Sequence, residues 1–571
     1  MESKSKEKGQ QQPWYVWVLF FLLLAAAAWG TRYWLSPTFG LYEDDLTFIP
    51  SAIEADFMGV LEMISGYFST LAEQGRPLMW SWVVLFAHLG WGIAGLQGMY
   101  ILGFTVWLFN ILLFVLLLRR IQGRFLFCVM GGLAYVVFSA DTTQAFLFNA
   151  FGLQPAITFL LLALHLYLIK GRLRWLAYPV LILVMLNYET PFLLFIAAPL
   201  LTTLNGRALK KQLLTNTLLV LLIFFAIYQL RLAAGDPRAS SLGFPEMILT
   251  PIRHMAIGPF VGLGAYFLRP LQVLRNITPE QGLAGAAASA VFFFALLWAR
   301  PEGEEPGVKL LPFRKGWWTD LQPEARREVR LLIAGILMLI TAYPLTVILR
   351  PYAISGRATR VHLAAVVGAS LILASFASLI FHSLVKQGWR ILFLGLLALV
   401  LGLNFAYGFV VQHDYQRAWR LQKEFWADLI PLIQDVQEGM AILVEPAAFQ
   451  DVLHIGANTW NLPRVLPQLY HFPEEWEPPP RVFRLIDGWQ NNIVRISGYF
   501  TLDGSNVYAS NRNFGDFIQK QTIFISGTED GLARRVEPLP LSGLRDVKPI
   551  GESVLNGFPT RPLHDLLIGE D

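Results

Sequence analysis

The sequence predicts an α-helical polytopic membrane protein with about 11 transmembrane helices and a C-terminal α/β domain. Of the 571 residues, 55% are hydrophobic and only 15% are charged, whereas an ordinary soluble domain carries about 25% charge. Long apolar segments recur up to about residue 411, and the sequence after that point is charged and contains no run long enough to span. These observations exclude a disordered chain, a coiled coil and a wholly soluble enzyme.

The predicted spans follow from the roughly 20 apolar residues that a helix needs to cross a bilayer. They are Trp14–Leu35, Gln97–Leu118, Arg124–Ala140, Gly152–Ile169, Leu173–Asn187, Thr190–Leu204, Leu213–Ala233, Gln281–Ala299, Leu331–Leu349, His362–Val385 and Trp389–Val411. Two further apolar stretches, Pro77–Gly90 and Ile257–Leu271, are short or interrupted by Gly and Pro. We expect both to lie flat at the membrane interface or to form juxtamembrane helices.

Basic residues mark alternate loops, which orients the chain because cytoplasmic loops carry an excess of Lys and Arg. The basic loops contain Lys4, Lys6 and Lys8; Arg119, Arg120 and Arg124; Lys170, Arg172 and Arg174; Arg207, Lys210 and Lys211; the cluster 300–330; and Lys386 and Arg390. This pattern predicts a plasma or inner membrane protein with a cytoplasmic N-terminus and an outside C-terminal domain. A cleaved signal peptide ending near Ala26–Ala28 is an alternative interpretation of the first helix.

Two domains are expected. Residues 1–411 form the transmembrane domain, with a first outer loop at 36–96, and residues 412–571 form a soluble extracytoplasmic α/β domain. Within the second domain, the patterns predict an amphipathic helix at Arg417–Val436 and strands at Ala441–Val444, Arg481–Ile486, Ile493–Leu502 and Gln521–Ser526.

The first outer loop is strongly acidic. Between Gly40 and Gly75 no Lys or Arg occurs, and the acidic residues are Glu43, Asp44, Asp45, Glu54, Asp56, Glu62 and Glu73. The first three are adjacent and come shortly after the first span, so their mutual repulsion calls for a cation, an arginine or a polar substrate. A simple solvated loop is the alternative.

The order of elements around this loop resembles the GT-C class of polytopic glycosyltransferases. The acidic cluster is followed by a predicted amphipathic helix at Asp45–Leu71, then by Gly75-Arg76-Pro77-Leu78, an interfacial stretch and a span ending in Arg119-Arg120. Protein O-mannosyltransferases, the lipid A aminoarabinose transferase and O-antigen glucosyltransferases belong to this class. The resemblance covers residues 14–411 in topology, but only Glu43–Asp45 and Gly75–Leu78 in motif.

The resemblance implies an enzyme that moves a hexose or pentose from a polyprenyl-phosphate donor to a glycan, lipid or protein acceptor at the outer face. Its general base is a motif carboxylate, a role that falls by position on Asp44 or Asp45, with Asp44 preferred. Glu43 or the second Asp would orient the acceptor. A divalent ion such as Mg²⁺ or Mn²⁺ at Asp44 and Asp45 stays open, because only some members of the class use a metal.

A lipid phosphate as leaving group calls for arginine, whose guanidinium fork matches phosphate oxygens. Arg350, Arg357 and Arg360 stand in the outer loop before the span His362–Val385, and Arg76 stands in the first outer loop. We predict that these four residues bind the donor phosphate. Anchoring to lipid head groups by snorkelling is the alternative.

Two other outer turns carry candidate acceptor-binding or auxiliary residues. Tyr188 and Glu189 lie between the fifth and sixth predicted spans, and Asp141 follows the third. An acid at membrane depth is costly and usually faces a cavity. Several relatives of the aminoarabinose type have a lysine in the turn that holds Glu189, and this sequence has none.

Two other classes of protein compete with the enzyme. A transporter or flippase of lipid-linked sugars would place ionisable residues within spans and often contains inverted repeats, whereas this sequence has few charges in its spans and no evident repeat. A non-catalytic membrane scaffold is the third interpretation. No phosphate-binding loop or dinucleotide fingerprint occurs, and we expect no nucleic acid partner.

Overall fold

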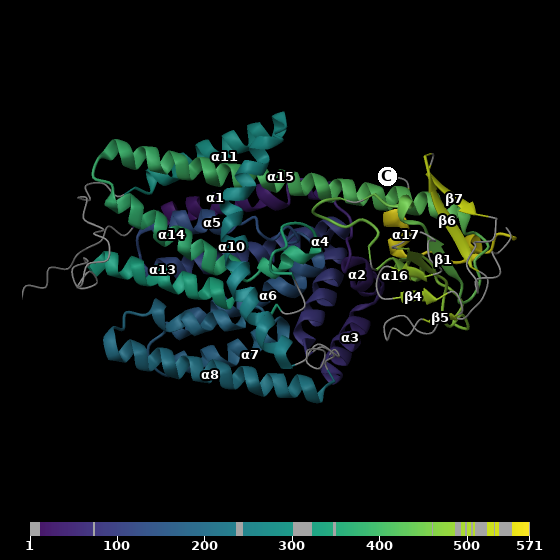
Figure 1. Ribbon diagram of the computed structural model, residues 1–571, viewed down its shortest axis with the longest axis horizontal. Helices are drawn as coiled ribbons and strands as arrows, with labels where there is room; N and C mark the ends of the chain where they lie inside the picture. Colours follow the sequence, from purple (N-terminus) through teal and green to yellow (C-terminus); the bar gives the residue numbers. More distant parts are fainter. Residues whose placement is uncertain are drawn as a thin grey trace, which may run out of the picture.

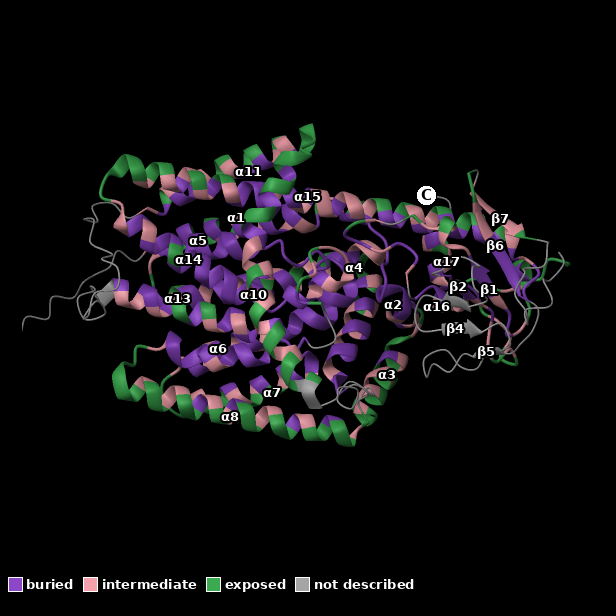
Figure 2. Ribbon diagram, in the orientation of Figure 1, coloured by how far each residue is buried: buried purple, intermediate pink, exposed green. Residues whose placement is uncertain are grey.

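The computed structural model describes residues 12–71, 75–235, 244–300, 323–346, 350–450, 452–459, 461–485, 493–496, 500–503, 506–508, 522–529, 531–535 and 551–569. Long helices lie along the longest axis, and the smaller C-terminal domain stands at one end (Figure 1). Buried residues fill the space between the helices, while much of α8 and α11 is exposed (Figure 2). Because many exposed side chains on these helices are large and apolar, the architecture indicates an integral membrane protein.

The described helices of the first domain follow one another along the chain in a fixed order. They are α1 (Trp14–Arg32), η1 (Ser36–Thr38), α2 (Asp45–Glu54), α3 (Phe57–Ser69), α4 (Pro77–Ile121), α5 (Phe125–Val136), η3 (Asn149–Leu153), α6 (Gln154–Tyr167), η4 (Arg172–Leu176), α7 (Ala177–Asn187), η5 (Phe192–Leu201), α8 (Gly206–Ala233), α10 (Phe244–Arg275), α11 (Pro279–Trp298), α13 (Pro323–Thr341), η6 (Arg357–His362), α14 (Ala365–Ser383) and α15 (Gln387–Leu432).

Eight helices in the described part of the chain are long and apolar enough to cross a membrane. The predicted number of about 11 is not confirmed. Three predicted spans form shorter elements: α5 has 12 residues, α7 has 11 and the 3₁₀-helix η5 has 10. The segment 301–322, which carries much of the predicted inner charge, lies outside the described residues.

The helix α4 joins two segments that the sequence separates. Its first part contains Pro77–Gly90 and its second part contains the predicted span Gln97–Leu118, with a kink at Ala94 and Gly95. Gly95 has a positive φ of 57°, which glycine adopts without steric cost. Gly98 packs against the carbonyl of Gly90 so closely that a Cβ atom would overlap it. The predicted break is present, but Pro77–Gly90 is the first arm of a kinked helix.

The helix α10 contains the stretch Ile257–Leu271 and is itself long and apolar enough to span. It runs across the direction of α8, α11 and α15 (Figure 1). Its residues reach several helices in turn: Tyr266 donates to Ala134 O and contacts Ser370 of α14, and Arg269 lies over the Tyr407 ring of α15. The interfacial placement of this stretch stays a prediction.

The first outer loop differs from the predicted single helix at Asp45–Leu71. Two helices, α2 and α3, replace it, because the chain is extended at Ala55 and Asp56. Asp56 accepts the backbone N–H of Gly59 at 2.7 Å and so caps the start of α3. Glu73, the last acidic residue of the loop, lies outside the described residues.

The helix α15 connects the two domains. Its 46 residues join the predicted span Trp389–Val411 to most of the amphipathic helix expected at Arg417–Val436, and the domain boundary expected at 411/412 lies inside it. Figure 1 shows its second half reaching the C-terminal domain. Gly40, which follows the first span, packs directly on the ring of Trp419.

The C-terminal domain contains a small mixed sheet in the order β2-β1-β6-β7. Strand β1 (Ala441–Val444) pairs in parallel with β2 (Arg481–Arg484) and β6 (Ile523–Thr528), and β7 (Gly531–Arg535) is antiparallel to β6. The strand expected at Ile493–Leu502 is instead an antiparallel hairpin of β3 (Ile493–Ile496) and β4 (Phe500–Asp503), to which β5 (Asn506–Tyr508) is added. The helices of this domain are η7 (Pro446–Ala448), α16 (Leu462–Leu469), η8 (Leu555–Gly557) and α17 (Pro562–Leu567).

Replacing Gly40 by alanine tests the contact between the two domains. A Cβ atom at this position overlaps the Trp419 ring, so Gly40→Ala should lower the free energy of unfolding by about 1–3 kcal/mol, as overpacking does elsewhere. Thermal unfolding of the detergent-solubilised protein measures the effect. Gly66→Ala is the matched control, since no heavy atom lies within 4 Å of the added carbon in α3. Equal melting temperatures for both variants would contradict the contact.

Candidate functional site

The three adjacent carboxylates point to three different sets of partners. Glu43 adopts a left-handed φ of 46°, which turns the chain sharply between the loop and α2. All three side chains are buried, with 3%, 7% and 0% exposure for Glu43, Asp44 and Asp45. Buried charges require compensation by partners, and the partners decide what each carboxylate can do.

Asp44 is held by two arginines from the loop before α14. Arg357 Nη2 donates to Asp44 Oδ1 and Oδ2 at 3.0 and 3.2 Å, and Arg360 Nη1 donates to Oδ2 at 3.2 Å. Arg357 Nε also lies 3.3 Å from Glu43 Oε2. Two of the predicted phosphate-binding residues are therefore in contact with the predicted catalytic carboxylate.

The helix η6 explains why both arginines face Asp44. A 3₁₀-helix has three residues per turn, so residues 357 and 360 share one face. Thr359 lies elsewhere on the turn and accepts the backbone N–H of Thr142 at 3.1 Å. At the end of η6, His362 Nδ1 lies 2.8 Å from the hydroxyl oxygen of Tyr343. Arg350 stands exposed at the start of this loop.

Asp45 serves a backbone segment. Its carboxylate accepts the N–H groups of Phe148 at 2.6 Å, Leu147 at 3.4 Å and Tyr42 at 3.2 Å. Burial raises the pKa of Asp45 to about 8, although these backbone donors favour its charged form. The side chain joins the start of α2 to the segment before α6, and its oxygens are occupied there.

Glu43 combines burial with a position at the edge of the cluster. Burial raises its pKa to about 7, although the Arg357 guanidinium acts in the opposite direction. The backbone N–H of Gly456, in the C-terminal domain, donates to this carboxyl group. A group with a pKa near neutrality can exchange a proton under physiological conditions.

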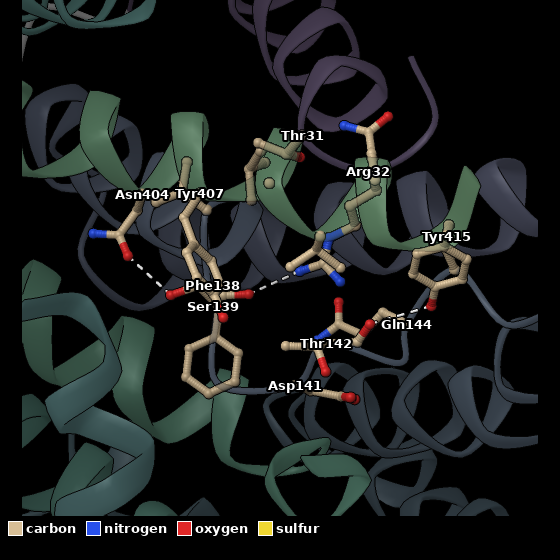
Figure 3. A pocket seen from close by; sticks show the side chains of 16 residues that line it. Thr31, Arg32, Phe138, Ser139, Asp141, Thr142, Gln144, Asn404, Tyr407 and Tyr415 are labelled. Carbon is tan, nitrogen blue, oxygen red and sulfur yellow. Dashed lines mark hydrogen bonds between the residues drawn. The ribbon is translucent and has the colours of Figure 1, made fainter. Parts of the chain in front are cut away.

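Asp141 lies beside the same cluster, at a small cavity of about 40 Å³ between α1, α15 and the 136–145 segment (Figure 3). Its Oδ1 accepts from the N–H and hydroxyl of Thr143 at 2.9 and 2.7 Å. Within the described chain, no hydrogen bond reaches Asp141 Oδ2 or Gln144 Oε1. Burial raises the pKa of Asp141, while the charges of Arg32 and Arg360 lower it. The cavity is large enough for ordered water.

The other predicted residues form a second cluster. Arg76 binds Glu189 through Nε, at 2.8 Å from Oε2, and through Nη2 to Oε1. Arg231 Nη2 lies 3.4 Å from the same carboxylate, and the Arg76 guanidinium lies 4.7 Å from the centre of the Tyr188 ring. The structure thus pairs a predicted phosphate ligand with a predicted acceptor ligand.

The C-terminal domain contributes residues that the sequence does not single out. Burial lowers the pKa of Arg464 in α16, and the negative charge of Asp44 is close enough to act in the opposite direction. Glu54 at the end of α2 binds Arg561 at 3.1 Å and His471 at 2.9 Å. No local pattern identifies such residues, since each acts through a contact with a distant segment.

The donor set around Asp44 does not suit a divalent metal ion. Both carboxylate oxygens already face guanidinium nitrogens, and a metal ion placed between them would be repelled by two positive charges. Among the described residues, no group of three or more His, Cys, Asp or Glu side chains is arranged to hold a metal. We therefore derive no step through Mg²⁺ or Mn²⁺.

Comparison with protein-family models, with curated proteins and with solved structures found no match. The GT-C resemblance therefore rests on the motif and on the order of elements.

Stability should fall as pH rises through the range in which Glu43 titrates. Its pKa rises from an ordinary value of 4.5 to about 7 on folding, so between those pH values the unfolded chain loses this proton first and its free energy falls relative to that of the folded state. Glu43→Gln should remove up to about 3 kcal/mol of this dependence. Melting temperatures from pH 4.5 to 7.5 measure it, with exposed Glu62→Gln as the control. Parallel curves for wild type and Glu43→Gln would contradict this assignment.

Proposed function

We propose that the protein is a membrane glycosyltransferase that moves a sugar from a polyprenyl-phosphate donor to an acceptor hydroxyl. The observation that supports this most directly is the pairing of Asp44 with Arg357 and Arg360. A carboxylate that can accept a proton and two guanidinium groups that can bind a phosphate meet at one place. Arg357 and Arg360 side chains are 33% and 18% exposed, which leaves the pair accessible to a ligand.

Because Asp44 is paired with Arg357 and Arg360, binding of the donor phosphate to these arginines would change the contacts of the general base. A lipid phosphate binds guanidinium groups through the same bidentate geometry as a carboxylate. When the donor phosphate binds Arg357 and Arg360, it takes over hydrogen bonds that Asp44 accepts in the absence of substrate. Asp44 is then released from its ion pairs, and its carboxylate oxygens can accept the proton of the acceptor hydroxyl.

The transfer itself needs one proton acceptor and one stabilised leaving group. The acceptor hydroxyl attacks the anomeric carbon as its proton moves to Asp44, and a new carbon–oxygen bond forms. The bond between the anomeric carbon and the phosphate oxygen breaks, and its electron pair stays on the phosphate. Arg357 and Arg360 stabilise that developing negative charge, an effect that is often the largest single contribution to catalysis.

The remaining predicted residues divide into positioning and auxiliary roles. Asp45 positions α2 through its backbone hydrogen bonds, and Glu43 positions Arg357. The cavity beside Asp141 can hold a water molecule that hydrogen-bonds to the bound acceptor. Arg76 and Glu189 neutralise each other, so we assign this pair, with Tyr188, to holding the outer loop against the turn after α7. Arg350 is assigned to the entrance of the site.

The site lies toward the end of the helical domain at which the C-terminal domain stands. With the predicted cytoplasmic N-terminus, this end faces outside, where a polyprenyl-linked sugar and a cell-envelope glycan, lipid or protein meet. Residues near Glu43 and Asp44 come from the C-terminal domain, which supports a role for that domain in covering the bound substrates.

Substitutions at the ion pair separate the two roles. Asp44→Asn should reduce sugar transfer by about 10²–10⁴-fold, the range expected for loss of a general base, while donor binding stays equal or becomes tighter because the competing carboxylate charge is gone. Arg357→Gln and Arg360→Gln should instead weaken donor binding. Transfer and binding are measured with purified protein and lipid-phosphate sugars, and Glu62→Gln serves as a surface control.

Three results would contradict the proposed function. Unchanged transfer by Asp44→Asn would contradict the assignment of Asp44 as general base. Unchanged donor binding by both arginine variants would contradict the assignment of Arg357 and Arg360 as the phosphate site. Lipid-linked sugar translocation in liposomes without any transfer would identify the protein as a flippase instead.

A further inference from the structure

A large cavity lies at the end of the helical domain opposite the C-terminal domain, where α8 and α13 begin (Figure 1). Its volume is about 790 Å³. The ends of α4 and α6, the helix η4, the turn after η5, and the first residues of α8 and α13 enclose it. It contains none of the residues assigned to sugar transfer.

The lining of this cavity is strongly basic. It includes Arg120, Lys170, Arg174, Lys211 and Arg327, each from a different segment of the chain. Within the described chain, no Asp or Glu belongs to the lining. An excess of basic residues is expected at this end from the loop pattern alone. That general trend does not explain why five segments direct cations into one hollow.

The cations of the cavity are not neutralised by carboxylates of the described chain. Arg120 donates to the backbone oxygen of His165 at 2.7 Å, and Arg174 lies 3.8 Å from the centre of the Tyr167 ring. Nearby Arg124, which is not part of the lining, instead binds Glu328. The lowered pKa of Arg327 reflects burial together with the positive charges of Arg330 and Arg124. A concave surface with unrelieved positive charge attracts anions.

The uncharged residues of the lining and the exposed apolar residues beside it indicate the kind of anion. Polar uncharged groups form part of the lining, where the Tyr178 hydroxyl donates to Asn216 Oδ1 at 3.0 Å. Trp175 of the lining is a large apolar side chain that is highly exposed, and so are its chain neighbours Leu173 and Leu176 and, on α8, Leu214 beside the lining residue Thr215. In a membrane protein, such side chains face the acyl chains of the bilayer. The cavity therefore combines a basic lining with exposed apolar side chains on the same segments of the chain.

We propose that this cavity binds the phosphate headgroup of an anionic membrane lipid, whose acyl chains pack against Trp175 and the exposed apolar side chains of the same segments, Leu173, Leu176 and Leu214. The lysines and arginines supply the charge-assisted hydrogen bonds that a phosphate monoester requires, and basic pockets between membrane helices recognise lipid headgroups in this way. The site goes beyond the proposed sugar transfer and does not depend on it.

Native mass spectrometry of the full-length protein in detergent tests the proposal with phosphatidic acid as the probe. Wild type should bind phosphatidic acid at least tenfold more tightly than phosphatidylcholine. The double variant Lys170→Gln with Lys211→Gln should lose at least tenfold in that affinity. The matched control, Arg172→Gln with Lys210→Gln, removes the same charge from neighbouring exposed residues outside the lining and should stay within twofold of wild type.

Competition with inorganic phosphate identifies the source of the ligand. If phosphate displaces the lipid only at concentrations far above that of phosphatidic acid, the lipid assignment holds. Equal affinity for free phosphate would overturn it. Equal loss in both double variants, or full binding by the Lys170/Lys211 variant, would also overturn it, because the cavity would then contribute nothing beyond diffuse surface charge. Melting temperatures without lipid verify that the variants are folded.

Discussion

The buried carboxylate of Asp44 imposes a requirement on the entire helical domain. A desolvated carboxylate is strongly unfavourable unless cations compensate it, and the cations of Asp44 come from residues 313 and 316 positions further along the chain. The loop after α1 and the loop before α14 must therefore lie together. The contacts of Thr359 with Thr142 and of His362 with Tyr343 hold the second loop in place, and Asp45 holds the first.

The sequence predicts which residues belong to this ion-pair cluster better than it predicts which of them contact each other. The sequence identifies the acidic run at Glu43–Asp45 because the residues are adjacent carboxylates in a loop without Lys or Arg. It identifies Arg357 and Arg360 because basic residues are unusual in a predicted outer loop. The pairing of Arg76 with Glu189 is different. The sequence predicts separate functions for the two residues, phosphate binding for Arg76 and acceptor binding for Glu189. Only the packing of α4 beside the turn after α7 shows that they neutralise each other. Arg464 and Gly456 are invisible in the sequence for the same reason.

Hydropathy predicts the long helices, including the largely buried α14, and overestimates helix length at some buried segments. Helices α1, α8 and α11 lie close to their predicted ranges, whereas α5 and η5 are short and almost wholly buried. A segment covered by other helices need not have the full bilayer length, so at α5 and η5 the apolar run alone does not define the helix. The kink in α4 depends on the left-handed φ of Gly95 and the contact of Gly98 with Gly90, neither of which hydropathy encodes. Beyond residue 411 of α15, Gly40 packs on the Trp419 ring, a contact that hydropathy does not encode either.

The two ends of the helical domain present their basic residues differently, and the difference follows from a single carboxylate. Where Arg357 and Arg360 lie, Asp44 already occupies the guanidinium groups, so an incoming phosphate must compete with a resident anion. In the proposed reaction, this competition would reject weakly bound anions and would favour a donor that supplies additional contacts through its sugar or its polyprenyl chain. At the opposite end, the described lining of the basic cavity contains no such competitor, which favours stable occupancy by an abundant lipid. Exchange suits a substrate that must leave after each turnover, whereas stable occupancy suits a ligand that supports the fold.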